Sequence, residues 1–187
     1  MKSQDYIYLK ENYYKKPKQQ FFFIKNHILK IKKKGKLLDL GCAKGEFIFF
    51  SEKYLKNFDY FTGVDYSKNL ISEAKRKNKS KNINFLVKNA ENFKLNQKYD
   101  IIIIAGLISY FDNPLKLINC SIKHLNKNGC IFIMDKFNEN NVDLIVKYRN
   151  NKISKKFEKG WNFHSIQTID KIFLKKKLNK KFSKIFE

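Results

Sequence analysis

The chain has 187 residues, of which 43% are hydrophobic, so a disordered chain is excluded and one full core is expected. Residues 1–16 contain no apolar run, and the run 101–108 is far shorter than the ~20 residues that span a bilayer. We therefore expect no signal peptide, no membrane span and a cytoplasmic location. The net charge of +23 suggests a nucleic-acid partner, but only Arg76 and Arg149 of the 40 basic residues are arginine. Lysine is one of the residues with AT-rich codons that dominate this sequence, so we favour a solvated basic surface.

Up to about residue 135, apolar runs with helical spacing alternate with short strand-like runs. A helix is predicted over 18–34, ended by Gly35, and a second helix carries the apolar face of residues 47–54. Ser67 is predicted to cap a third helix, and Asn113 and Pro114 to open a fourth that runs to Leu125. A turn is predicted at 127–129. The strands that accompany these helices are predicted at 36–40, 58–65, 83–87, 99–105 and 130–135.

The pattern is weaker after residue 135, where the chain becomes polar and contains its single tryptophan, Trp161. Residues 166–173 have the spacing of one more helix, and residues 182–186 resemble one more short strand. Strands that alternate with helices of this length predict an α/β fold, with a parallel, doubly wound sheet covered by helices on both faces.

The loops after the first two predicted strands carry the first sign of a ligand site. Gly41 and Gly45 allow a tight turn and a close approach of the backbone to a ligand at the start of a helix. Asp65 ends the second strand, 24 residues after Gly41, where a carboxylate can accept hydrogen bonds from both hydroxyls of a ribose. The alternative for a lone aspartate is a cap on the next helix, and Gly63 beside it favours the ligand site.

Several motifs then follow in a characteristic order and spacing between residues 36 and 135. They are DLGCAKG (39–45), GVDYS (63–67), KNAENF (88–93), YDIIIIAGLISYFDNP (99–114) and LNKNGCIFI (125–133). In this order they resemble the motifs of class I S-adenosylmethionine-dependent methyltransferases, which have a Rossmann-like fold. The first two motifs are the specific part of the resemblance.

The resemblance implies S-adenosylmethionine as the cofactor, S-adenosylhomocysteine as its product, and a role for each matching residue. Asp39, Gly41, Cys42 and Gly45 would shape the pocket for the methionine moiety, with Cys42 as a small wall residue and not a nucleophile. Asp65 would hold the ribose and Tyr66 would lie against the adenine, whose edge would meet Asn89, Ala90 and Glu91. Ala105 and Gly106 would pass beneath the sulfonium.

The sequence departs from the family pattern in two places. Ala43 stands where many members have a glycine, and this change also weakens a nicotinamide-dinucleotide interpretation of the loop. The family's sheet normally ends in an antiparallel pair of strands, whereas only 182–186 is available here. We therefore expect one domain over 1–187 that lacks the last strand of this hairpin and is shortened at its C-terminus. It would consist of a cap (1–35), a cofactor-binding core (36–135) and a substrate-side segment (136–187).

The catalytic base is less well defined than the cofactor site. Asp135 after the fifth strand and His164 in the irregular segment are the candidates, each with a structural role as the alternative. Tyr13 and Tyr14 are candidates for lining the acceptor pocket or for a plain hydrophobic cap. No metal is expected, since the three cysteines have no CxxC spacing and no cluster of ligand residues is visible.

The acceptor is narrowed by motifs that the chain lacks. The fourth strand continues into AGLI, unlike the NPPY or DPPY of enzymes that methylate exocyclic amino groups, and no Pro-Cys dipeptide exists for cytosine C5 chemistry. We therefore expect methyl transfer to a small molecule or a surface sugar. The alternatives are an RNA or protein methyltransferase that uses the basic surface, and an inactive or truncated cofactor-binding protein.

Overall fold

The computed structural model describes residues 16–149 and 156–179. They form two compact units, one made of residues up to 105 together with 116–134, the other of 106–115 together with residues from 135 onward. The expected strand at 182–186 and the candidates Tyr13 and Tyr14 lie outside the described residues.

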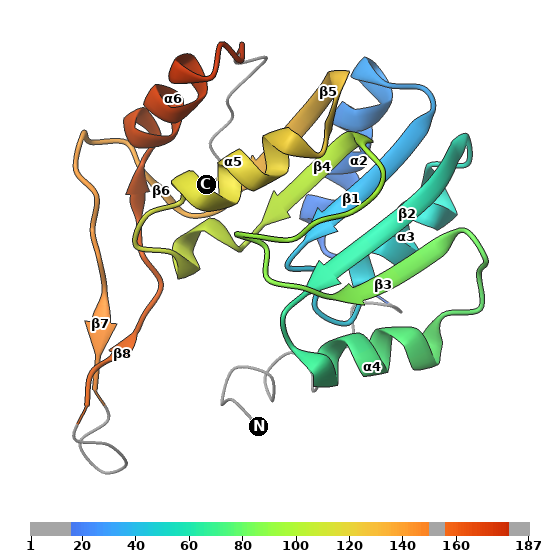
Figure 1. Ribbon diagram of the computed structural model, residues 1–187, viewed down its shortest axis with the longest axis horizontal. Helices are drawn as coiled ribbons and strands as arrows, with labels where there is room; N and C mark the ends of the chain where they lie inside the picture. Colours follow the sequence, from blue (N-terminus) through green and yellow to red (C-terminus); the bar gives the residue numbers. More distant parts are fainter. Residues whose placement is uncertain (1–15, 150–155, 180–187) are drawn as a thin grey trace. The chain divides into compact units, whose positions relative to one another are not determined.

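A five-stranded sheet forms the centre of the first unit, and all of its strands are parallel (Figure 1). The strand order is β3-β2-β1-β4-β5, so the chain starts in the middle and winds outward in both directions, as predicted for a doubly wound sheet. Its strands are β1 (Gly35–Leu40), β2 (Phe58–Asp65), β3 (Ile83–Val87), β4 (Tyr99–Ala105) and β5 (Leu125–Met134). Among the described residues, no strand extends this sheet beyond β5.

Helices cover both faces of the sheet because its strands are apolar on both sides. In Figure 1, α2 (Gln19–Ile31) and α3 (Glu46–Tyr54) lie behind the sheet, and α5 (Leu115–Lys123) lies in front of it. The helix α4 (Lys68–Lys77) joins β2 to β3. Its N-cap is Ser67, whose hydroxyl accepts a hydrogen bond from the backbone N–H of Leu70 at 3.3 Å, which confirms the predicted cap.

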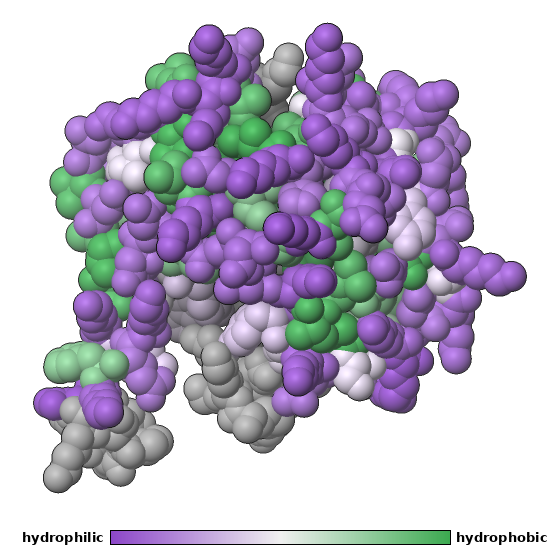
Figure 2. Space-filling model, viewed as in Figure 1, coloured by the Kyte–Doolittle hydropathy of each residue, from purple (hydrophilic) through white to green (hydrophobic). Residues whose placement is uncertain are grey.

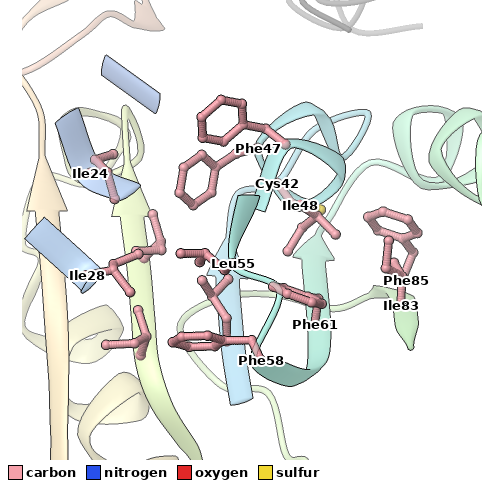
Figure 3. Packing of buried hydrophobic residues seen from close by; sticks show 14 of the residues in the cluster. Ile24, Ile28, Cys42, Phe47, Ile48, Leu55, Phe58, Phe61, Ile83 and Phe85 are labelled. Atoms are coloured by element: carbon pink, nitrogen blue, oxygen red, sulfur yellow. The ribbon is translucent and has the colours of Figure 1, made fainter. Parts of the chain in front are cut away.

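The main core lies between the sheet and the helices α2, α3 and α4 (Figure 3). Ile24 and Ile28 of α2 and Phe47 of α3 enter this core. Phe85 of β3 is 1% exposed and packs its ring against that of Phe49 at 5.5 Å between centroids. This packing fixes the start of α3 against β3, and therefore positions the loop that follows β1.

The join between α5 and β5 differs from the prediction. The helix ends at Lys123, and Leu125 is the first residue of β5, not the last helical residue. The predicted turn at 127–129 is also wrong, since these residues belong to β5. Leu125 pairs with Tyr99, and regular pairing resumes at Cys130 with Ile101, so β5 contains extra residues between this single pair and the regular ladder. The Asn-Gly pair is thus accommodated as an irregularity in a strand.

The second unit is built from short elements. A 3-10 turn, η1 (Ile108–Tyr110), is followed beyond β5 by four two-residue strands and a helix. These are β6 (Phe137–Asn138), β7 (Lys147–Tyr148), β8 (Glu158–Lys159), β9 (His164–Ser165) and α6 (Ile166–Lys175). The helix α6 confirms the prediction for 166–173, with the Ser165 hydroxyl as its N-cap.

Candidate cofactor site

Asp65, at the carboxyl end of β2, joins two loops through its side chain. Oδ2 accepts a hydrogen bond from the backbone N–H of Ala43 at 3.0 Å, and Oδ1 accepts one from that of Ser67 at 2.9 Å. The residue is 8% exposed, so these bonds hold the carboxylate in one orientation. A carboxylate oxygen can accept more than one hydrogen bond, which is the property that binding of two ribose hydroxyls requires.

The loop after β1 closes onto the end of β2. The backbone N–H groups of Gly41 and Cys42 donate to the carbonyl oxygen of Val64 at 2.8 and 3.1 Å. Gly45 then begins α3 with a φ of 78°, in the left-handed region, and no side chain caps the helix. Ala43 also has a left-handed backbone, with a φ of 48°. The position where many family members have glycine therefore keeps the conformation that favours glycine.

Two buried carboxyl groups dominate the electrostatics of this loop. Asp39, on β1, is 4% exposed, and its burial followed by the negative charge of Asp65 raises its pKa well above the usual range. Burial, together with Asp39 and Asp65, likewise raises the pKa of the Cys42 thiol. Cys42 is therefore a protonated, buried side chain, which agrees with its interpretation as a wall residue and not a nucleophile.

Tyr66 and the loop after β3 lie next to Asp65. Tyr66 follows Asp65 directly and is 52% exposed, an unusual degree of exposure for a large aromatic ring. The backbone N–H of Lys88 donates to the Asp65 carbonyl oxygen at 2.9 Å, which holds the third loop beside the second. In this third loop the Asn89 side chain accepts a hydrogen bond from the Glu91 N–H at 2.9 Å, and Ala90 between them is buried.

The fourth loop begins at the end of β4. Ala105 is half-buried and Gly106 is exposed with a φ of 64°. A Cβ atom built on Gly106 would meet no atom within 4 Å among the described residues, so this turn borders open space. The carboxyl ends of β1 to β4 thus bring together the predicted residues from Asp39 to Ala105, and Gly106 begins the second unit.

A buried ion pair in the first loop escaped the sequence prediction. Lys44 is 2% exposed and Glu46 is 8% exposed, with 3.5 Å between Nζ and Oε1. A lysine and a glutamate two residues apart normally indicate solvent exposure, so the sequence gives no signal for this burial. Because the pair lies between Ala43 and the first turn of α3, it adds a fixed charge pair to the loop.

The two candidate bases make structural hydrogen bonds within the second unit. Asp135 accepts from the backbone N–H groups of Ser109 at 3.0 Å and Lys136 at 2.9 Å. His164 is 1% exposed and its Nε2 lies 2.7 Å from the carbonyl oxygen of Phe111. These bonds support the structural alternative for both residues.

The described part of the chain has no group of three or more histidine, cysteine or acidic side chains placed to hold a metal ion. Within the same residues, no helix is both long and apolar enough to pass through a bilayer.

A doubly wound parallel sheet with a glycine loop after β1 and a fixed carboxylate after β2 is the arrangement found in class I S-adenosylmethionine-dependent methyltransferases, which share it with dinucleotide-binding proteins. A family model described as "Methyltransferase domain" matches residues 31–187, and the chain belongs to this family. Several solved structures similar to this chain contain S-adenosylhomocysteine, the product of the family's cofactor.

Among curated relatives, malonyl-[acyl-carrier protein] O-methyltransferase 1 of Ilyobacter polytropus is 33% identical over 103 residues, covering 54% of this chain and 37% of that protein. The ubiquinone biosynthesis O-methyltransferase of Pelagibacter ubique is 36% identical over 101 residues, covering 52% and 40%. Both matches span well under half of the relative's length.

Among solved structures, the plantazolicin methyltransferase BpumL, bound to S-adenosylhomocysteine and a desmethyl analogue of plantazolicin, is 25% identical with a TM-score of 0.59. The match covers 73% of this chain and 55% of that one. A methyltransferase structure from Listeria monocytogenes shares the fold, with a TM-score of 0.63 over 80% of this chain and 81% of that one at 14% identity.

Proposed function

We propose that this chain transfers a methyl group from S-adenosylmethionine to a small-molecule or surface-sugar acceptor. The observation that carries the proposal is the Asp65 carboxylate, which is fixed by two backbone N–H groups beside the exposed ring of Tyr66. A fixed acceptor for two hydroxyls next to an exposed aromatic ring suits a nucleoside, with its ribose and its flat base.

The residues at the carboxyl ends of β1 to β4 fit the cofactor. Asp65 would accept the ribose hydroxyls, and Tyr66 would lie against the adenine. Asn89, Ala90 and Glu91 would line the adenine edge, while Ala105 and Gly106 would pass beneath the sulfonium. The sulfonium supplies an activated methyl electrophile, so the chain's own residues need chiefly to orient the two reactants and exclude water.

In the first loop, the close backbone approach would be made by Gly41 and Gly45, with Asp39 and Cys42 forming the wall. Cys42 stays protonated there because burial and two nearby carboxyl groups raise its pKa. The first loop therefore binds the cofactor and shapes its pocket, and the Cys42 thiol does not act as a base.

A tRNA (guanine-N(7)-)-methyltransferase of Prochlorococcus marinus, 32% identical over 114 residues, fits the RNA alternative, but the names of the three relatives described above support a small acceptor without fixing which one. They act on a malonyl group on a carrier protein, on a ubiquinone precursor and on the peptide plantazolicin. These acceptors differ widely, as expected when one cofactor core is combined with different acceptor segments. The turn AGLI after β4, which lacks the NPPY or DPPY motif, supports an acceptor other than an exocyclic amino group.

Calorimetric titration with S-adenosylhomocysteine tests the cofactor site directly. We expect micromolar binding by the wild-type chain and a loss of about 5- to 150-fold in Asp65→Asn, since hydrogen bonds to a charged group contribute about 1–3 kcal/mol. Asp59→Asn is the matched control, because Asp59 lies on the same strand and is exposed. Asp59→Asn should bind like wild type.

Because Asp65 also holds Ala43 and Ser67, circular dichroism must show that Asp65→Asn is folded at the titration temperature. Tyr66→Ala provides a second variant, which removes the exposed ring proposed to lie against the adenine. A folded wild-type chain that does not bind S-adenosylhomocysteine would overturn the proposal. Once binding is established, transfer from methyl-labelled cofactor to candidate acceptors identifies the substrate.

A further inference from the structure

An antiparallel ribbon in the second unit carries a surface that the proposed function does not use. We define the ribbon as residues 144–149 and 157–163, centred on β7 and β8 (Figure 1). Lys147 lies opposite Lys159 and Tyr148 opposite Glu158. Leu144 bridges Phe163, with backbone bonds of 2.9 and 3.0 Å in both directions. The pairing therefore continues on both sides of a bulge at 161–162.

Side chains alternate between the two faces of such a ribbon, so its residues divide into two sets. One face carries Tyr148 and Glu158, whose hydroxyl and carboxylate are 3.2 Å apart. The other, which we call the ribbon face, carries Arg149, Phe157, Lys147, Lys159 and Trp161.

The ribbon face exposes its aromatic rings. Phe157 is 64% exposed and Trp161 is 52% exposed, values that burial in a core does not explain. The guanidinium of Arg149 lies over the Phe157 ring at 5.0 Å from its centroid. The Tyr110 ring packs edge-on against the Trp161 ring, with 6.4 Å between the ring centroids, and this contact restricts the orientation of Trp161. The two rings are four residues apart on one strand, or about 13 Å.

The stability of the ribbon does not explain the positive charges of the ribbon face. Like charges directly opposite each other on neighbouring strands destabilise a ribbon, yet Lys147 and Lys159 occupy such a pair. Asp112 offsets part of this repulsion, since its carboxylate lies 3.2 Å from the Lys159 ammonium. Both lysines are exposed, and the face keeps a net positive charge.

Arg149 is a second, independent sign of selection. The chain uses lysine at all but two of its 40 basic positions. Arg76, one of the two arginines, forms a bidentate pair with Glu73 on α4. The other stands on the ribbon face against an aromatic ring. A codon bias toward lysine explains the lysines, and the pair with Glu73 accounts for Arg76, but neither explains Arg149. Figure 2 shows hydrophilic side chains spread widely over the visible surface, so charge alone does not distinguish the ribbon.

We propose that the ribbon face binds single-stranded nucleic acid. Bases would stack on Phe157 with its arginine and on Trp161, and the intervening phosphates would meet Lys147 and Lys159. Rings alternating with cations are the arrangement that single-strand binding requires, because every base has a flat face and every link carries a negative charge. This proposal is independent of the proposed function, since it involves none of the residues at the carboxyl ends of β1 to β4.

The fluorescence of Trp161 reports binding without any label, because it is the single tryptophan of the chain. Titration with a 12-nucleotide oligouridylate should quench this fluorescence through stacking. Phosphate contacts by Lys147 and Lys159 predict a slope of about −1.4 in log K against log salt, or about a 7-fold loss of affinity between 50 and 200 mM potassium chloride.

Three variants separate stacking from charge. Phe157→Ala should bind about 5- to 150-fold more weakly, and Phe157→Tyr should restore binding because it keeps the ring. Lys147→Gln/Lys159→Gln should reduce the magnitude of the salt slope by about 1.4. The matched control is Lys75→Gln/Lys79→Gln, which removes two exposed charges elsewhere and should leave the slope near the wild-type value.

Heparin and polyglutamate are the competing probes, since they carry charge without bases. The proposal is supported if the oligouridylate binds tightly and quenches the Trp161 fluorescence, while heparin and polyglutamate bind weakly or without quenching it. The absence of quenching in the folded chain would overturn it, as would binding that Phe157→Ala leaves unchanged. Tighter binding of polyglutamate would also overturn it, in favour of an acidic protein partner. Titration with S-adenosylhomocysteine runs in parallel, and ribbon variants should not affect it.

Discussion

Substitution of Gly45 tests how the first loop is held against the sheet. Gly45 has a φ of 78°, and a Cβ built there lies 2.4 Å from Cζ of the buried Phe85 ring. The left-handed backbone costs an alanine about 1–2 kcal/mol, and overpacking costs about 1–3 kcal/mol. The smaller freedom of alanine in the unfolded chain offsets about 0.4–1 kcal/mol. Gly45→Ala should therefore lower the free energy of unfolding by about 1.5–4 kcal/mol.

Two further glycines separate these contributions. Gly63 does not have a left-handed backbone, but its Cβ would lie 2.6 Å from Phe85, so Gly63→Ala tests overpacking alone. Gly106 has a φ of 64° and open space around it among the described residues, so Gly106→Ala tests the backbone alone. Urea denaturation measures each free energy, provided that the m value stays constant.

Phe85→Leu completes the test by shortening the ring that meets both Cβ positions. In this background, Gly45→Ala and Gly63→Ala should cost less than in the wild type, and Gly106→Ala should cost the same. The reasoning would be refuted by a Gly45→Ala chain within about 0.5 kcal/mol of wild type, or by a cost that Phe85→Leu leaves unchanged.

Three other substitutions have defined outcomes. Ala43→Gly removes the left-handed strain of about 1–2 kcal/mol, but the greater freedom of glycine in the unfolded chain costs about 0.4–1 kcal/mol. Urea denaturation should therefore show a free energy of unfolding that is higher by up to about 1.5 kcal/mol. A lower free energy of unfolding would contradict the assigned strain. Ser67→Ala removes the α4 cap and should cost about 1 kcal/mol, unlike Ser72→Ala within the same helix. Asp39 has a raised pKa in the folded state, so the folded chain binds the extra proton and loses stability as pH rises from about 4 towards that pKa. The stability of Asp39→Asn relative to wild type should therefore increase with pH over this range, and a decrease would contradict the cause assigned to the shift.

The sheet and its loops could be predicted from the sequence because β4 contains an unbroken apolar run and the other predicted runs are short and rich in apolar residues. The runs 58–65, 83–87 and 99–105 match β2, β3 and β4 residue by residue. A strand that is buried on both faces needs continuous apolar residues, and glycine or aspartate marks where it ends. The loop residues after these strands could be located in the same way.

The remaining features depend on contacts that local sequence does not encode. Asn128 and Gly129 have the chemistry of a turn, but the pairing of Cys130 with Ile101 extends the strand across them. Burial of Lys44 beside Glu46 depends on the fold of the loop around them. The ribbon could not be predicted because its strands have two residues each, too few for any periodicity.

The order in which the sheet is synthesised differs from its order in space. The central strand β1 has β2 on one side, but its other neighbour, β4, ends about 40 residues after β2 does. At about 5–20 residues per second, a ribosome takes roughly 2–8 s to add those residues. Until β4 has been synthesised, the edge of β1 at Leu37, Leu38 and Leu40 has no partner strand. Unpaired strand edges associate with other chains. The nascent chain is therefore most prone to aggregation before residue 105 leaves the ribosome, and slower translation of 66–105 would lengthen that exposure.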